Sequence, residues 1–125
     1  MYEIGVSTRF EAAHRLHGDF GPATRVHGHS YRLDAIVRGP RLRSDGTLLD
    51  ITIVQGALAA IVADLHYRDL DEVPDLAGIN TTAEEVAAYC WRRIAAALQV
   101  HPEATHLSVR IWENSDVYGG YSSDL

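Results

Sequence analysis

The sequence of 125 residues contains little of several residue types, and each shortage excludes a class of protein. A single cysteine, Cys90, rules out an internal disulfide and suits a reducing compartment. No apolar run approaches the roughly 20 residues that cross a bilayer, and the first residues show no signal-peptide pattern. We therefore expect a cytoplasmic protein without membrane contact.

Basic residues are also scarce, because 11 Lys and Arg stand against 17 Asp and Glu, for a formal net charge of −6. They are scattered along the chain, which argues against a nucleic-acid-binding groove. There are no repeats, low-complexity tracts or linkers, and a hydrophobic content of 46% is enough for a core. The length suits one globular domain, residues 1–125.

Two hydrophobic periodicities predict the elements of this domain. Apolar and polar residues alternate over 2–10, 27–39 and 105–113, which indicates strands, and Gly119 with Gly120 suggests a bulged final strand. Residues 51–65 carry an apolar stripe at helical spacing. A second helix begins at Thr82, which forms a capping box with Glu85.

The order of these elements predicts an α+β fold, in which an antiparallel sheet carries two helices on one face. The helices leave the other face of the sheet uncovered. We therefore expect a homo-oligomer that covers this face.

Histidine is the residue that the chain has in quantity, with seven copies. His27 and His29 flank Gly28 in a predicted strand, where residues i and i+2 project to the same face. His14 lies just past the end of the first strand, so pairing of the two strands would bring it close. Three neutral imidazoles with a fourth position open are typical of a catalytic zinc site. From spacing alone, a packed or hydrogen-bonded histidine pair is an equal alternative.

Five segments, in the order in which they occur, resemble the 6-pyruvoyl-tetrahydropterin synthase family, whose bacterial branch includes 6-carboxy-tetrahydropterin synthase of queuosine biosynthesis. They are "FEAAHRL", "HGHSY", "LLDI", "NTTAEEVA" and "VRIWEN", followed by Tyr121. The resemblance covers nearly the whole chain. It implies the tunnelling fold, a four-stranded antiparallel sheet with two helices on one face. It also implies an oligomeric β-barrel, in which trimers form the barrel and pairs of trimers form hexamers.

The resemblance further implies a set of site residues. His14, His27 and His29 match the family's zinc ligands, and Glu113 matches the glutamate that holds the pterin ring. A carboxylate at 113 would accept two parallel N–H bonds from the pterin, although a solvated glutamate at a strand end is the alternative. Thr82 is a candidate substrate contact, but as a helix N-cap it already has a structural role.

Three positions depart from the family at the residues that handle protons. Family members carry a cysteine base four residues before the first histidine of His-Gly-His, where this chain has Ala23. They also carry an Asp-His pair after the first helix, where this chain has His66 and Tyr67. His66 as a base and Tyr67 as a proton donor are candidate catalytic residues, and an ordinary helix end is the alternative. Cys90 lies on a helical apolar stripe and is expected in the core.

These features predict a zinc-dependent lyase or synthase with an altered proton relay, acting on a pterin or pterin-like small molecule. The reaction would be of the aldol, isomerisation or elimination type. One alternative is a conventional 6-carboxy-tetrahydropterin synthase with a substitute base, and another is a non-catalytic zinc- and ligand-binding homologue. The first interpretation is preferred because His66 and Tyr67 are proton-active rather than inert.

Overall fold

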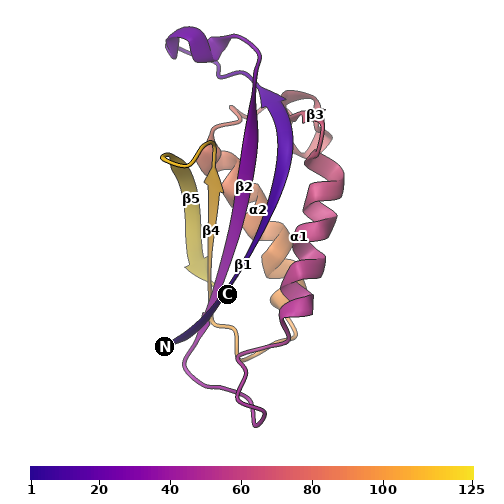
Figure 1. Cartoon of the computed structure of the whole chain (residues 1–125), viewed down its shortest axis with the longest axis vertical. Helices are drawn as coiled ribbons and strands as arrows, with labels where there is room; N and C mark the ends of the chain where they lie inside the picture. The colour runs from indigo at the N-terminus through magenta and orange to yellow at the C-terminus, as the bar shows by residue number, and fades with distance from the viewer.

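The computed structural model describes residues 1–125 and shows one sheet with two helices packed against one of its faces (Figure 1). The strand order is β3-β1-β2-β4-β5. The strands are β1 (Tyr2–His14), β2 (His27–Gly39), β3 (Arg68–Asp69), β4 (His106–Trp112) and β5 (Tyr118–Asp124). The four long strands pair antiparallel, which confirms the predicted α+β class and the four-stranded antiparallel sheet.

Two details of the sheet differ from the prediction. The first strand continues to His14 rather than ending at Phe10, because it pairs with β2 over its whole length. The two alanines in "FEAAH" blur the alternation that would have revealed this extension. The short strand β3 is an addition that makes the sheet mixed, since it runs parallel to β1 beside Ala12 and Ala13.

Both helices begin at a side chain that satisfies a free backbone N–H group. Asp50 caps α1 (Ile51–Leu65) by accepting a hydrogen bond from the Thr52 N–H at 2.9 Å. The Thr82 hydroxyl caps α2 (Ala83–Leu98) by accepting from the Glu85 N–H at 3.2 Å, as predicted. Three short 3-10 turns complete the chain: η1 (Gly21–Thr24), η2 (Leu70–Glu72) and η3 (Pro74–Leu76).

The core lies between the sheet and the helices, where inward-facing strand residues meet the apolar stripes of α1 and α2. Its largest fully buried members include Phe10, Tyr31, Leu33, Leu58, Ile61, Leu65, Ile94 and Leu107. Cys90 is completely buried among them, as expected, and burial raises the pKa of its thiol to about 12. Neither helix has the length and apolar character that a membrane-spanning segment needs.

The predicted bulge in the last strand is wrong. The β4–β5 ladder is regular from Trp112 opposite Tyr118 to the end of β5. The glycines serve close packing instead: a Cβ on Gly119 would lie 2.8 Å from the Ala83 Cβ, and one on Gly120 would lie 2.8 Å from the Val109 carbonyl oxygen. They let β5 approach the first turn of α2 and the neighbouring strand.

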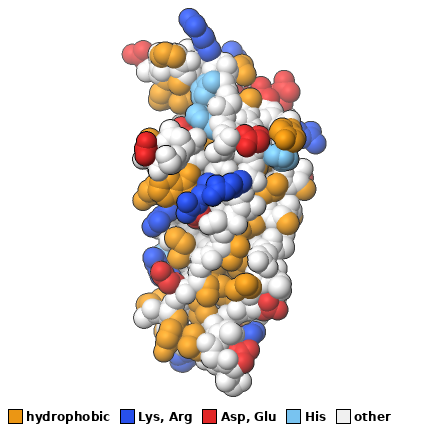
Figure 2. Space-filling view, in the orientation of Figure 1, with side chains coloured by type: hydrophobic (Ala, Val, Ile, Leu, Met, Phe, Trp, Pro, Cys, Tyr) orange, Lys and Arg blue, Asp and Glu red, His pale blue; other side chains and the backbone are white.

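The second face of the sheet is left uncovered by helices and carries charged side chains across its middle (Figure 2). Asp34 is 6% exposed there and accepts hydrogen bonds from Ser7, Arg32 and the Trp112 indole. Burial acts to raise the pKa of Asp34, but these hydrogen bonds outweigh burial and lower it. Because an antiparallel sheet can present one polar face to water, this face does not by itself require a covering partner.

Candidate metal centre

Three histidines converge at the end of the sheet beside the loop that joins β1 to β2. His14 lies directly opposite His27 in the strand ladder, and His29 follows two residues later on the same face. One ligand nitrogen of each histidine lies within 4.8 Å of the other two. The juxtaposition expected from strand pairing is therefore present.

Backbone carbonyls fix the ring orientation of two of these histidines. The Nδ1 atom of His14 lies 2.8 Å from the Thr81 carbonyl oxygen, and that of His27 lies 2.7 Å from the Arg25 carbonyl oxygen. Because a carbonyl oxygen only accepts, each Nδ1 carries a proton, and in a neutral ring Nε2 then keeps its lone pair. This is the tautomer in which an imidazole binds a metal through Nε2.

Two of the Nε2 atoms in the cluster lack any hydrogen-bond partner. The Nε2 atoms of His14 and His29 are both buried and unpaired. Leaving a buried polar atom unpaired costs about 1–3 kcal/mol, so two in one cluster call for a bound group. A metal ion held by the cluster would satisfy both atoms, and the residues therefore fit a metal.

The protonation state of His29 agrees with a ligand role. Burial lowers its pKa, and this effect outweighs the opposing pull of the Glu113 carboxylate, whose Oε2 atom lies 3.8 Å from His29 Nε2. His29 is therefore mostly neutral at pH 7, as a metal ligand must be. Three imidazole nitrogen donors suit zinc or another late transition metal and do not suit Mg²⁺ or Ca²⁺, which prefer oxygen.

Tyr31 lies beside the cluster and was missed by the sequence analysis. Its ring stacks on Phe10 at 5.0 Å between centroids and meets the His29 ring edge-on at 5.2 Å. The hydroxyl is buried without a partner. Burial raises the pKa of Tyr31 far above its ordinary value, and the carboxylates of Glu113 and Asp71 raise it further. The phenol therefore remains a hydrogen-bond donor. The row His27, His29, Tyr31 could have revealed it.

The two predicted substrate-binding residues, Glu113 and Thr82, lie at the end of β4 and at the start of α2. Glu113 follows β4, and its partly buried side chain points to His29, so it is not a freely solvated strand-end residue. Thr82 is placed as the cap of α2, with its hydroxyl oxygen on the Glu85 N–H. Its neighbour Thr81 is the threonine that contacts the cluster, because its carbonyl oxygen binds His14.

Comparison with known proteins identifies the family. The family model described as 6-pyruvoyl tetrahydropterin synthase matches residues 3–124. The chain belongs to this family. The 6-pyruvoyl tetrahydrobiopterin synthase of Poecilia reticulata is 31% identical over 137 aligned residues, which cover 94% of this chain and 91% of the relative. The 6-carboxy-5,6,7,8-tetrahydropterin synthase of Synechocystis sp. is 30% identical, with 78% of each chain covered.

A solved structure confirms the tunnelling fold of the family. The 6-pyruvoyl tetrahydropterin synthase of Caenorhabditis elegans matches with a TM-score of 0.83, covering 98% of this chain and 95% of that chain at 21% identity. Relatives named for the pyruvoyl and the carboxy product match at similar identity. Membership thus supports a pterin synthase activity as a class, without distinguishing the product.

The turn η1 holds the position at which the family resemblance expects a cysteine base. Ala23 is partly buried there, and its carbonyl oxygen accepts a hydrogen bond from the Leu16 N–H at 2.9 Å. The residues of this turn are Gly21, Pro22, Ala23 and Thr24, none of which titrates. The turn therefore supplies no base, and the contact with the cluster from this loop comes from the Arg25 carbonyl oxygen on His27.

His66 and Tyr67 lie on the outer side of β1, between α1 and β3. The His66 Nδ1 atom accepts a hydrogen bond from the Glu11 N–H at 3.0 Å, and the Tyr67 N–H donates to the Glu11 carbonyl oxygen at 2.7 Å. Tyr67 is 80% exposed, and its φ of 57° lies in the left-handed region. Neither side chain hydrogen-bonds to the three histidines, but Tyr67 lines one hollow together with His29. The Glu11 N–H takes the lone pair of His66 Nδ1, so His66 presents an Nε2–H donor here and would have to release this hydrogen bond to act as the predicted base. The catalytic role of both residues stays a prediction.

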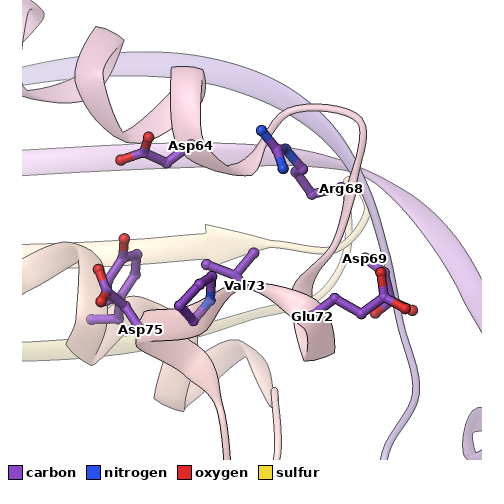
Figure 3. Close-up of a pocket in the computed structure, with 8 residues that line it drawn as sticks. Asp64, Arg68, Asp69, Glu72, Val73 and Asp75 are labelled. Atoms are coloured by element: carbon purple, nitrogen blue, oxygen red, sulfur yellow. The ribbon is translucent and has the colours of Figure 1, made fainter.

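A different hollow lies between the end of α1 and the turns η2 and η3 (Figure 3). Its lining includes Asp64, Arg68, Asp69, Glu72 and Asp75. It contains none of the three clustered histidines and no unpaired buried polar atom. The histidine cluster, and not this acidic hollow, is the candidate metal centre.

Proposed function

We propose that the chain is a zinc-dependent lyase or synthase that acts on a pterin or pterin-like small molecule through a proton relay different from that of its family. One observation carries this proposal. The histidine cluster is complete, with two unpaired buried Nε2 atoms, while Ala23 in η1 stands where the family resemblance expects a cysteine. The binding machinery is thus kept while a base is missing.

Different side chains around the cluster would bind the metal and the substrate. His14, His27 and His29 would hold the zinc ion, which when bound supplies Lewis-acid polarisation of a substrate oxygen. Glu113 would accept two N–H bonds from the pterin ring, as a carboxylate does with paired donors. The Tyr31 phenol is a donor without a partner beside this centre.

The proton relay needs groups other than a thiol. Cys90 does not supply one, because it is completely buried in the core and burial raises its pKa to about 12. The positions of the family's Asp-His pair hold His66 and Tyr67, both of which carry exchangeable protons. We assign proton transfer to these two residues, in an aldol-type, isomerisation or elimination reaction.

An assay of the zinc-loaded protein with dihydroneopterin triphosphate and, separately, with sepiapterin tests this function. Chromatography with fluorescence detection would follow both substrates, with the metal-free protein as control. We expect zinc-dependent conversion of sepiapterin and little loss of dihydroneopterin triphosphate. Efficient conversion of the triphosphate would instead support a conventional synthase with a substitute base. Pterin binding without any conversion would support a non-catalytic homologue.

We also propose that the protein is a cytoplasmic homo-oligomer, a trimer or hexamer. The family resemblance supports this assembly, as does the unpaired outer edge of β5, because exposed strand edges tend to pair. The single buried, unpaired thiol agrees with a reducing compartment. Light scattering should give a mass that is a multiple of three 13.8 kDa chains. A uniform monomer at micromolar concentration would contradict the assembly.

A further inference from the structure

A chain of hydrogen bonds leads away from the metal centre to a carboxylate that the sequence analysis did not single out. The Nδ1 atom of His14 lies 2.8 Å from the Thr81 carbonyl oxygen and 3.4 Å from the Thr81 hydroxyl oxygen. That hydroxyl donates to Asp71 Oδ1 at 2.9 Å. Because its proton goes to Asp71, the hydroxyl turns a lone pair toward the Nδ1–H of His14.

The Asp71 carboxylate binds groups on both sides of the contact between His14 and Thr81. Its Oδ2 atom accepts a hydrogen bond from the Arg15 N–H at 3.0 Å, on the residue directly after His14. Its own N–H donates to Asp69 Oδ1 at 2.9 Å, which fixes the carboxylate at the start of η2. One side chain therefore ties the end of β1 to the residue that precedes the cap of α2.

His14 and Thr81 are both buried, so the hydrogen bonds between them determine which nitrogen of His14 carries the proton. His14 is 1% exposed and Thr81 is fully buried, so water does not replace a lost hydrogen bond between them. If His14 carried its proton on Nε2 instead, that nitrogen would have no lone pair for a metal. The correct tautomer depends on keeping the acceptors of the Nδ1–H group in position.

We propose that Asp71 is a positioning residue of the metal centre, which acts through Thr81 to present the unprotonated Nε2 of His14 to the metal. The inference rests on the proposed zinc-binding function. Partners of this kind, one step removed from a metal, typically change metal affinity by about 10–100-fold when they are removed.

Zinc affinity, measured by competition with a chelating indicator, tests the role of Asp71 and Thr81. Thr81→Val removes the hydroxyl at nearly constant volume, and Asp71→Asn removes the charge and one acceptor. We expect each to weaken zinc binding by about 10-fold or more. Thr81→Ser retains the hydroxyl and should bind zinc like the wild type. Glu72→Gln, which neutralises the exposed neighbouring carboxylate, should also bind like the wild type.

The tautomer of His14 provides a readout that a purely structural defect would not produce. Thr81→Val keeps the carbonyl oxygen that accepts from His14 Nδ1–H but loses the hydroxyl that ties Thr81 to Asp71. Long-range proton–nitrogen spectra of the metal-free protein should show Nδ1–H alone in the wild type and in Thr81→Ser. In Thr81→Val, where the carbonyl is no longer held by Asp71, they should show an added Nε2–H population. Thermal unfolding of the metal-free variants checks that they fold. If Asp71→Asn fails to fold, the zinc affinity and tautomer of Thr81→Val decide the question. Unchanged zinc affinity and unchanged tautomer in Thr81→Val would overturn the inference. A wild-type protein that binds no zinc would overturn the proposed function instead.

Discussion

Replacing His27 by alanine should remove most of the zinc that the purified protein carries. We expect about one zinc per chain in the wild type, because the cluster offers three nitrogen ligands and one open position. In His27→Ala only two imidazoles remain, and two ligands hold the ion poorly. Metal analysis after dialysis against a chelating resin gives the zinc content directly.

His27 is the best of the three ligands to remove, because the fold depends on it least. His14 is 1% exposed, so its loss would also disturb the core. His27 is partly exposed, and the only hydrogen bond of its side chain runs to the Arg25 carbonyl oxygen two residues away. His106→Ala is the matched control, since His106 pairs with Asp124 at the opposite end of β4 and should leave zinc content unchanged.

Thermodynamic linkage supplies a second measurement of the same variant. Zinc that binds only the folded state should stabilise the wild type by about 2.7 kcal/mol at a free concentration about 100 times the dissociation constant. His27→Ala should lose this zinc-dependent stabilisation while keeping nearly the stability of the metal-free protein. Full zinc occupancy in His27→Ala would show that the metal assignment is wrong.

The parts of the site that could be predicted from sequence are those fixed by local periodicity. The alternation in "HGHSYRLDAIVRG" predicts the bounds of β2 and places His27 and His29 on one face. The convergence with His14 needed only the pairing of β1 with β2, because strands that follow one another in the chain usually lie side by side. The same logic predicts both helices and the cap at Thr82, because these features depend on residues close together in the chain.

The parts that could not be predicted depend on contacts between distant residues. Thr81 meets His14 across 67 positions, and His66 meets Glu11 across 55. Nothing in the local pattern of "NTTAEEVA" shows that the first threonine enters the site while the second caps the helix. The two-residue strand β3 is likewise set by its position beside β1, because so short a segment has no period of its own.

Restoring the family's proton-handling residues should create or strongly increase turnover of dihydroneopterin triphosphate. The variant combines Ala23→Cys, His66→Asp and Tyr67→His. Since a positioned general acid or base contributes about 10²–10⁴-fold, even imperfect geometry should give a measurable gain. The assay compares initial rates of zinc-loaded wild type and variant at equal zinc content.

The structure has room for these replacements. An aspartate at 66 carries a carboxylate able to accept the Glu11 N–H bond that His66 Nδ1 now accepts. Histidine is among the residues enriched at positive φ, which suits the 57° at Tyr67. Ala23 takes part in the hydrogen bonds of its turn only through its backbone, so a cysteine side chain breaks none of them.

The single variants separate the contribution of the thiol from that of the pair. Ala23→Cys alone should gain less than the triple variant, because a thiol is a useful base only where its surroundings favour the thiolate. Ala23→Ser in the background of the other two changes is the matched control, since it places a hydroxyl of similar size without a readily ionised proton. If the unmodified protein already converts the triphosphate efficiently, the missing base has a substitute in this chain. In that case the proposal of an altered proton relay is wrong. The chain is then a conventional synthase in which another residue serves as the base.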